Sequence, residues 1–141
     1  LHALMACAPQ HAALFEASLR DNLLLGRELP EATIESWLQR LGLRHLLDRQ
    51  DGLDAPMALA QSPFSGGEIH RLGLLRAWPR NRPVEVLDEP TAFLDAVAAA
   101  RVREVIQERS RQRLVLVSSH DPELLNLSDA VINLGAAGVR S

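Results

Sequence analysis

The second half of the sequence alternates between short apolar runs and a helix-forming segment. Residues 84–87 and 114–117 are mostly apolar and too short for a helix, and residues 96–109 between them have amphipathic helical spacing. Two strands joined by a helix are typical of parallel pairing, because parallel strands need a long crossover. A short helix over residues 122–127 and a last strand over residues 130–134 continue the pattern. The sequence therefore predicts an α/β fold with a parallel sheet.

The first half of the sequence has mostly helical patterns. Residues 3–8 form a short apolar run that Pro9 stops, which predicts a buried strand that runs into a loop at Gln10. Leucines at helical spacing predict helices over residues 15–25, 30–41 and 43–47, and glycines close the first two. Residues 50–63 lack a sustained period, so we expect a loop that leads to Ser65.

Composition excludes several classes of function. The chain has 141 residues, 47% of them hydrophobic, which is enough for one sizeable core. A net charge of −3 without basic runs argues against binding to nucleic acid or to an anionic membrane surface. Cys7 is the only cysteine, so an internal disulfide or a thiolate metal cluster is excluded and a reducing compartment is expected. The start at Leu1 leads us to expect a piece of a longer protein.

Ser65-Gly66-Gly67-Glu68 has the S-x-x-E pattern of a helix capping box. That structural role accounts for the serine and the glutamate. Two glycines in a first helical turn are destabilising, however, unless something approaches the backbone closely, and bare amides at a helix N-terminus bind phosphate. Both interpretations, a capped helix and a phosphate contact, remain open at this point.

Asp88 and Glu89 follow the apolar run at residues 84–87, and Pro90 comes directly after them. An ordinary junction between a strand and a turn would explain the pair. In a phosphoryl-transfer site the same pair has two roles, because one carboxylate holds Mg²⁺ and the other faces the attacking water. We expect the two side chains to point to opposite sides, since side chains alternate along a strand.

Other polar residues stand where helices begin or strands end. Asp95 and Asp121 each precede a predicted helix, so they are expected N-caps. His120 lies between a buried strand and a helix, and Gln10 follows the first strand in the same way. The carboxyl edge of a parallel sheet is where open α/β folds bind ligands, which favours phosphate contact for His120 and Mg²⁺ ligation for Gln10.

The remaining histidines lack the spacing of metal ligands, and we interpret them as surface or internally satisfied residues. They are His2, His11, His45 and His70. Trp37 and Trp78 fall on predicted helical faces, which indicates packing instead of base stacking.

Five of these segments stand in an order that resembles the ATP-binding cassette family of transporter ATPases. Gln10 in "APQHAALFEASLRDNLLLG" is similar to the Q-loop, and its Leu-Phe and Leu-Arg-Asp-Asn-Leu resemble exporter-type cassettes. "FSGGE" resembles the signature motif, "VEVLDEP" the Walker B strand with its catalytic glutamate, "AFLD" the D-loop and "SSHD" the H-loop with its switch histidine. Five ordered motifs over nearly the whole chain are far more specific than any one of them.

The resemblance implies a fold and a domain organisation. The chain would be the C-terminal part of a P-loop NTPase (RecA-like) parallel sheet core with an inserted all-helical subdomain. Residues 11–80 would form the helical subdomain with the signature motif, and residues 1–10 and 81–141 would belong to the catalytic α/β core. All fifteen basic residues are arginines, and the family's Walker A lysine would lie upstream of Leu1. We therefore expect the chain alone to bind and hydrolyse ATP poorly.

The resemblance also implies cofactors, roles and partners. The cofactors would be ATP and Mg²⁺, with Glu89 and His120 as catalytic residues and Gln10 and Asp88 as Mg²⁺ ligands. The residues expected to bind the nucleotide are Gln10, Ser65, Gly66, Gly67, Glu68 and Asp95, of which those of the signature motif would act on the site of a second cassette.

The expected function is ATP hydrolysis in a head-to-tail dimer of cassettes, coupled to transport across a membrane. The second cassette can be identical or different, and the membrane domains are expected on the same polypeptide. The cassette would lie at the cytoplasmic face of the inner (plasma) membrane, without a nucleic-acid partner. Two alternatives remain: a non-transport cassette ATPase, and a regulatory cassette that binds nucleotide without turnover.

The sequence departs from the family pattern at several positions. Phe64 replaces the usual leucine of the signature, His70 replaces a common glutamine, and "PMALAQSP" replaces a segment with Gly and Glu. Glu85 interrupts a strand that is normally apolar, and a buried carboxylate there is unfavourable unless it is paired or lies at the sheet margin.

Overall fold

The computed structural model describes residues 4–57 and 64–133. Three strands form a parallel sheet in the order β1-β2-β3. They are β1 (Met5–Ala8), β2 (Val84–Asp88) and β3 (Leu114–Ser118). In register, Ala8 lies beside Leu87 and Leu87 beside Val117. The parallel sheet predicted from the apolar runs is confirmed.

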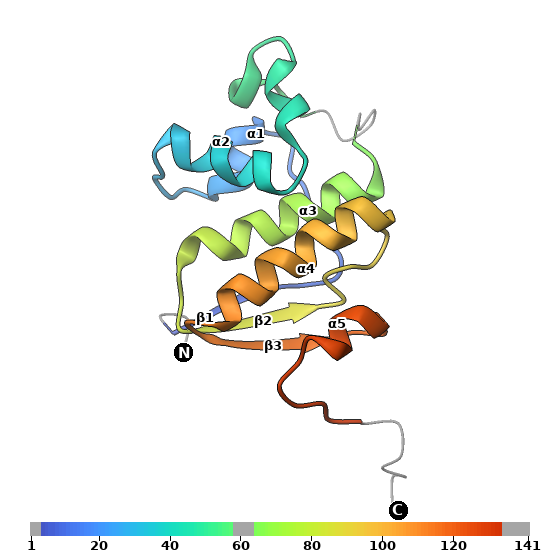
Figure 1. Ribbon diagram of the computed structural model, residues 1–141. Coiled ribbons are helices and arrows are strands. Elements are labelled where there is room, and N and C mark those ends of the chain that lie inside the picture. The colour runs from blue at the N-terminus through green and yellow to red at the C-terminus, as the bar shows by residue number, and fades with distance from the viewer. Residues whose placement is uncertain (1–3, 58–63, 134–141) are drawn as a thin grey trace, which may run out of the picture.

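Two helices cover one face of this sheet (Figure 1). They are α3 (Gly66–Ala77) and α4 (Ala96–Ser110). Because side chains alternate along a strand, the covered face carries buried residues such as Ala6, Ala8 and Leu87. On the opposite face, within the described ranges, Leu114 and Leu116 are 56% and 48% exposed. These two leucines give the second face an exposed apolar surface, whereas a parallel sheet normally has both faces covered.

The helices of the first half lie beyond α3, on the side away from the sheet (Figure 1). They are α1 (Leu19–Leu24), α2 (Glu31–Arg40) and the short 3₁₀ helices η1 (Arg44–Asp48) and η2 (Gly52–Asp54). Leucines from these helices and from α3 form one buried core with the sheet residues. A further 3₁₀ turn, η4 (Trp78–Arg80), follows α3, and α5 (Pro122–Asn126) follows β3.

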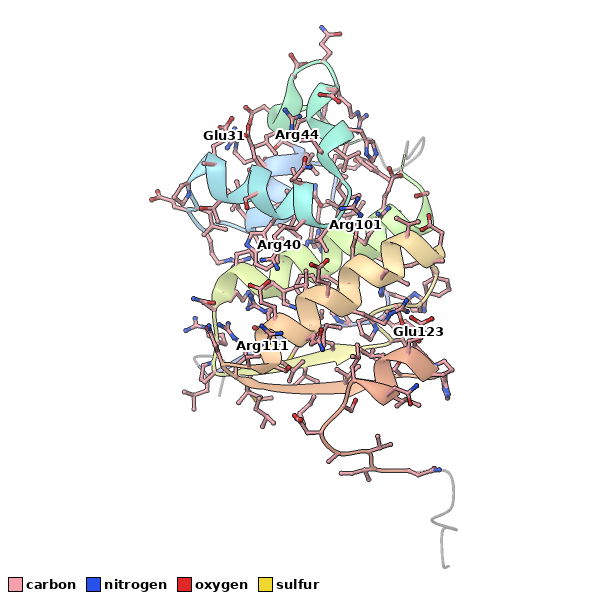
Figure 2. All side chains as sticks on the ribbon, in the orientation of Figure 1. Glu31, Arg40, Arg44, Arg101, Arg111 and Glu123 are labelled. Atoms are coloured by element: carbon pink, nitrogen blue, oxygen red, sulfur yellow. The ribbon has the colours of Figure 1, made fainter. Side chains whose placement is uncertain are left out.

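Polar side chains join the first-half helices to α3 and α4. Arg40 is the last residue of α2 (Figure 2), and its Nη2 is 2.5 Å from Oε2 of Glu108 in α4. Arg71 of α3 donates to the Leu41 carbonyl at 2.9 Å. The rings of Trp37 and Trp78 stack with centroids 5.6 Å apart, and Trp78 is fully buried. The prediction that both tryptophans serve packing is confirmed.

Several predicted elements differ in extent from those observed. The helix expected over residues 15–25 begins only at Leu19, because Ser18 caps it, and the third predicted helix is the 3₁₀ helix η1. The strand predicted over residues 130–134 is wrong for residues 130–133, which form no strand; residue 134 lies outside the described residues. Val131 and Ile132 are 59% and 85% exposed, and a strand needs a neighbouring ladder.

The described helices include none that is long and apolar enough to cross a membrane.

Candidate functional site

The carboxyl ends of the three parallel strands bring the predicted site residues to one edge of the sheet. Gln10 follows β1, Asp88 is the last residue of β2, and His120 follows β3. This placement follows from strand direction alone, because parallel strands end at the same edge. Gln10, Asp88, Glu89 and His120 therefore share the edge where open α/β sheets bind ligands.

Asp88 is exposed and held by the neighbouring strand. It lies beside Ser118 in the register of β2 and β3, and the Ser118 hydroxyl donates to Asp88 Oδ1 at 2.5 Å. Asp88 falls on the uncovered face of the sheet, because it alternates with buried Leu87. Its second carboxylate oxygen is the ligand type that Mg²⁺ prefers.

Glu89 no longer belongs to the strand. Its φ is 46°, in the left-handed region, so the simple alternation predicted for Asp88 and Glu89 does not apply. The backbone N–H of Glu89 donates to the Ser118 carbonyl at 2.9 Å, and the Ala92 N–H donates to the Glu89 carbonyl at 3.0 Å. These bonds stabilise a conformation that is unfavourable for a residue with a Cβ atom.

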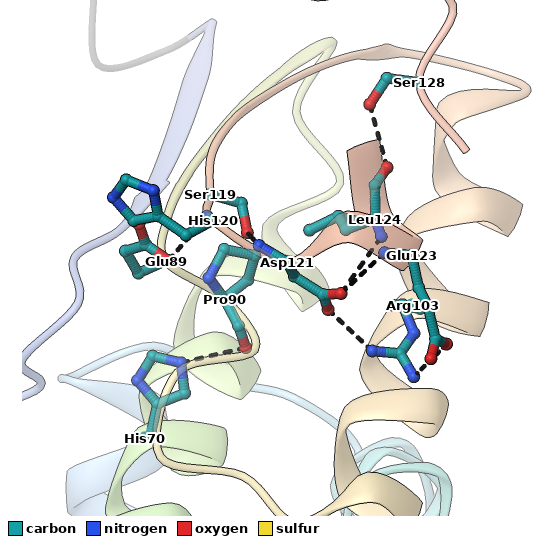
Figure 3. A network of polar contacts seen from close by, with 10 residues as sticks. All are labelled: His70, Glu89, Pro90, Arg103, Ser119, His120, Asp121, Glu123, Leu124 and Ser128. Carbon is teal, nitrogen blue, oxygen red and sulfur yellow. Dashed lines mark hydrogen bonds and ion pairs between the residues drawn. The ribbon is translucent and has the colours of Figure 1, made fainter. Parts of the chain in front are cut away.

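The carboxylate of Glu89 faces His120 (Figure 3). His120 Nε2 lies 3.5 Å from Glu89 Oε1, and the His120 backbone N–H donates to Glu89 Oε2 at 3.4 Å. The His120 side chain is 98% exposed and that of Glu89 is 21% exposed. The imidazole can therefore reach a ligand in front of the edge, while the carboxylate beside it is partly withdrawn from solvent.

The capping box predicted at Ser65 is present. The Ser65 hydroxyl accepts from the Glu68 N–H at 3.2 Å, and the Glu68 carboxylate accepts from the Ser65 N–H at 2.7 Å. His45 Nε2 lies 2.6 Å from Glu68 Oε1. Burial raises the pKa of the Glu68 carboxyl, but hydrogen bonds from Ser65 and His45 outweigh burial and hold the pKa below its ordinary 4.5. Glu68 is thus an ionised cap.

The two glycines at the start of α3 differ in their surroundings. A Cβ atom on Gly66 would meet nothing within 4 Å, whereas one on Gly67 would lie 3.0 Å from the Phe93 carbonyl oxygen and 3.4 Å from Leu94 Cδ2. Close packing of α3 against the segment at residues 93–94 therefore requires Gly67. Gly66 has open space before it, so its bare backbone is accessible to a ligand.

His70 links the loop after β1 to the turn after β2. It is only 3% exposed, with Nδ1 2.9 Å from the Gln10 carbonyl oxygen and Nε2 3.0 Å from that of Pro90. Its ring also lies edge-on to Phe93 at 6.2 Å. A hollow of about 290 Å³ beside these residues is lined by Gln10, His11, Ala12, Gly66, Ile69, His70 and Phe93.

The predicted caps at Asp95 and Asp121 are confirmed. Asp95 accepts from the Ala98 N–H at 2.8 Å at the start of α4. Asp121 accepts from the Glu123 N–H at 3.0 Å, and Arg103 Nη1 lies 2.7 Å from its carboxylate (Figure 3). Arg103 thereby fixes the segment that carries His120 to α4.

Sequence reasoning missed three contributors to the site. Phe93, whose φ of 62° is left-handed, lies in the AFLD segment and Ser118 in the SSHD segment, but neither is assigned a role from the sequence. His70 is interpreted as a surface or internally satisfied residue. The interpretation of His70 as internally satisfied is correct, but its hydrogen-bond partners lie 60 and 20 residues away in the sequence. The nearest available signal was the departure from the family's glutamine at this position.

The donor set fits Mg²⁺ held together with phosphate oxygens. Among the described residues, no group of three or more His, Cys, Asp or Glu side chains could hold a metal ion by itself. Mg²⁺ usually takes one or two protein ligands and leaves the others to phosphates and water. One carboxylate, Asp88, and one amide, Gln10, at the same edge agree with that pattern.

The chain is similar in sequence to known transport proteins. The sequence model of a family described as "ABC transporter" matches residues 1–92. The "Glutathione/L-cysteine transport system ATP-binding/permease protein CydC" of Escherichia coli (strain K12) is 37% identical over 117 residues, which are 82% of this chain and 20% of that protein. The "Beta-(1-->2)glucan export ATP-binding/permease protein NdvA" of Bartonella quintana (strain Toulouse) is 32% identical over 134 residues, which are 92% of this chain and 22% of that protein.

One solved structure supports the fold. The "Structure of a bacterial Atm1-family ABC exporter with ATP bound" matches with a TM-score of 0.80 and 22% identity, and the match covers 91% of this chain and 23% of that chain. The fold predicted from the sequence, a partial P-loop NTPase, is thereby confirmed. The chain spans roughly a fifth of the length of the two curated relatives. Its sequence, its parallel sheet and its relatives together place it, as part of an ATP-binding cassette of the exporter type, in the ABC transporter family.

Proposed function

We propose that the chain supplies the residues for the hydrolytic step of an ATPase cassette that, in the complete protein, drives transport across a membrane. One observation carries this proposal: Glu89 and His120 face each other 3.5 Å apart beside Asp88, at the carboxyl edge of a parallel sheet. A general base next to a metal-binding carboxylate and a phosphate-contacting imidazole is the set that phosphoryl transfer to water requires.

The residues of this edge would divide the work. Glu89 orients the attacking water and receives its proton, and the His120 backbone N–H keeps the carboxylate in place. The exposed His120 ring donates a hydrogen bond to the terminal phosphate of ATP. Asp88, oriented by Ser118, and Gln10 hold Mg²⁺, which when bound offsets the negative charge of the phosphates.

The start of α3 would serve a second cassette instead of the same one. Gly66 opens onto free space, and a helix N-terminus with accessible amides attracts phosphate. In this proposal Ser65, Gly66 and Gly67 face the ATP held by the partner cassette, with Glu68 as their cap. Asp95 fixes the start of α4, next to the segment that packs on Gly67, and so supports the dimer contact indirectly.

We further propose the division of the chain that the family resemblance suggested. Residues 11–80 form the helical subdomain, and residues 1–10 and 81–141 belong to the catalytic core. The arrangement in Figure 1 supports this division, because α1 and α2 are separated from the sheet by α3. The uncovered face with Leu114 and Leu116 would pack against the remainder of the core, which includes the loop with the phosphate-binding lysine.

The whole protein would be a fused exporter. The names of both curated relatives combine an ATP-binding part with a permease part, which supports membrane domains on the same polypeptide. The cassette would then lie at the cytoplasmic face of the inner (plasma) membrane and pair with an identical or different cassette. Closure of the pair on ATP and reopening after hydrolysis would drive the membrane domains.

The Glu89→Gln variant of the complete protein tests the proposed function. The amide keeps the size of the side chain but cannot accept a proton, so ATP turnover should fall by about a hundredfold or more. Binding of ATP should remain, because Asp88 and Gln10 are unchanged. Equal turnover in the variant and the parent would contradict the proposal, and an inactive parent that still binds ATP would indicate a regulatory cassette.

A further inference from the structure

His70 is buried between the two segments that carry Gln10 and Glu89. Its side chain comes from α3, and each ring nitrogen faces a carbonyl oxygen, at 2.9 Å for Gln10 and 3.0 Å for Pro90. Figure 3 shows the contact with Pro90, the residue that directly follows Glu89. One side chain thus joins the signature helix, the loop after β1 and the turn after β2.

Both partners of His70 can only accept hydrogen bonds. An N–H on a ring nitrogen therefore donates to the carbonyl oxygen that this nitrogen faces. One of the two carbonyls belongs to Gln10 itself, and the other belongs to Pro90, which directly follows Glu89. A phenylalanine at this position could keep the edge contact with Phe93, at 6.2 Å, but it could donate to neither carbonyl.

The turn after β2 depends on few contacts. Glu89 has a φ of 46°, and among the described residues hydrogen bonds connect this turn to the end of β3 on one side and to His70 on the other. The bond from Glu89 N–H to the Ser118 carbonyl, 2.9 Å long, fixes the side toward β3. His70 is the side chain that fixes the side toward α3.

We propose that His70 is a positioning residue for hydrolysis: it holds the backbone beside Glu89 and the backbone of Gln10 at a fixed separation from the signature helix. The inference rests on the proposed function for its effect on turnover. The structural part of the proposal, that His70 holds two loops in place, does not depend on that function. A movement of α3 would be transmitted through His70 to both loops, because the ring contacts each of them directly.

The test compares His70→Phe with His70→Gln in the complete protein. His70→Phe removes every ring N–H donor and keeps an aromatic ring, and His70→Gln supplies N–H donors from an amide instead. His11→Gln is the matched control. His11 is exposed, directly follows Gln10 in the loop after β1, and has its ring 5.7 Å from that of Phe93. Two quantities are measured: steady-state turnover of ATP, and amide hydrogen exchange of residues 10–13 and 89–94.

We expect His70→Phe to lower kcat by about tenfold, with a change in the KM for ATP below about twofold, because the lost hydrogen bonds displace the base while Asp88 keeps its contact with Ser118. Exchange should accelerate in both segments and not elsewhere. His70→Gln should stay within about threefold of the parent in kcat, and His11→Gln should match the parent.

Other outcomes would overturn the inference. Parental kcat in His70→Phe would refute the effect on hydrolysis, and unchanged exchange in both segments would refute the fastening. If His70→Phe does not fold, the test relies on His70→Gln. Rapid amide exchange of both segments in the folded His70→Gln variant would refute the positioning role of the hydrogen bonds from residue 70. Turnover that does not respond to Glu89→Gln would refute the proposed function, whereas the exchange measurement would still test the fastening by His70.

Discussion

The carboxylate of Glu85 pairs with the guanidinium of Arg109 inside the protein, where their side chains are 0% and 7% exposed. Arg109 Nε lies 2.9 Å and 2.8 Å from the two carboxylate oxygens. Arg109 also donates to the Trp78 carbonyl at 2.7 Å, and its guanidinium lies 5.4 Å from the centre of the Trp37 ring. The acid that interrupts the apolar strand is thus paired, and the pair connects β2, α4 and the helices beyond α3.

Removal of one partner of this pair should destabilise the fold strongly. Among the described residues, Arg109→Met leaves the buried Glu85 carboxylate with Arg113 alone, whose Nη1 is 3.3 Å away, so we expect a loss of about 3 kcal/mol in the free energy of unfolding. Chemical denaturation of the complete protein measures it. The double variant with Glu85→Leu should be more stable than Arg109→Met alone, because the buried carboxylate that lost its main partner is then absent. Strictly additive effects would show that the two residues do not interact.

The two glycines of the signature should respond differently to alanine. Gly67→Ala places a Cβ 3.0 Å from the Phe93 carbonyl oxygen, so it should lower the free energy of unfolding by about 1 to 3 kcal/mol. Gly66→Ala meets nothing within 4 Å and should keep the parental stability. If the partner's phosphate approaches this backbone, Gly66→Ala should nevertheless reduce ATP turnover. Parental turnover in Gly66→Ala would remove the support for a phosphate contact there.

Replacement of Asp88 should alter the dependence of turnover on Mg²⁺. Asp88 is exposed and accepts from the Ser118 hydroxyl at 2.5 Å, so Asp88→Asn should fold normally. The lost charge should raise the Mg²⁺ concentration for half-maximal turnover by about tenfold or more. Titration of ATP turnover with Mg²⁺ measures the shift. Asp129→Asn, the same change at another exposed position, is the control, and an identical titration of both variants would exclude Asp88 as a ligand.

Asp121 should make the stability depend on acid pH. Burial raises the pKa of its carboxyl, but hydrogen bonds from Arg103, Thr91 and the first amides of α5 outweigh burial and hold the pKa below its ordinary 3.8. Because the pKa of Asp121 is lower in the folded state than in the unfolded state, the ionised carboxylate stabilises the fold at pH values above 3.8. This contribution is lost as the pH falls through the pKa of the folded state. The free energy of unfolding of Asp121→Asn should therefore lie below that of the parent at neutral pH, because the amide has no charge to pair with Arg103.

The pH dependence of that difference provides the check. Denaturation of the parent and of Asp121→Asn at neutral pH and at successive values below 3.8 should show two curves that converge in acid, because the parental carboxyl then becomes neutral as well. A constant difference at every pH would mean that the charge of Asp121 does not contribute.

Local chemistry explains why much of the fold could be predicted. Short apolar runs identify β1, β2 and β3, and a hydroxyl or carboxylate just before a helix identifies the caps at Ser65, Asp95 and Asp121. The clustering of Asp88 and His120 at one edge follows as well, since parallel strands end on the same side. These signals depend on neighbours in the chain, which the sequence displays directly.

Features that depend on distant partners could not be predicted. The strand expected at residues 130–134 had the right composition, but residues 130–133 are not paired as a strand, and Ile132 is 85% exposed. The departure from the family's glutamine at His70 does not reveal its role, because the Gln10 and Pro90 carbonyls that it contacts lie 60 and 20 residues away. The left-handed backbone of Glu89 likewise depends on the Ser118 carbonyl, which belongs to another strand.

The sequence by itself determined the α/β class, the helix starts and the set of residues at the sheet edge, because spacing and capping chemistry act over a few residues. Only the tertiary structure decided that Glu85 is stabilised by Arg109, that Gly67 is required by the Phe93 carbonyl, and that His70 joins two loops. Each of these relations joins atoms from segments far apart in the chain, and such contacts form only when the helices pack on the sheet.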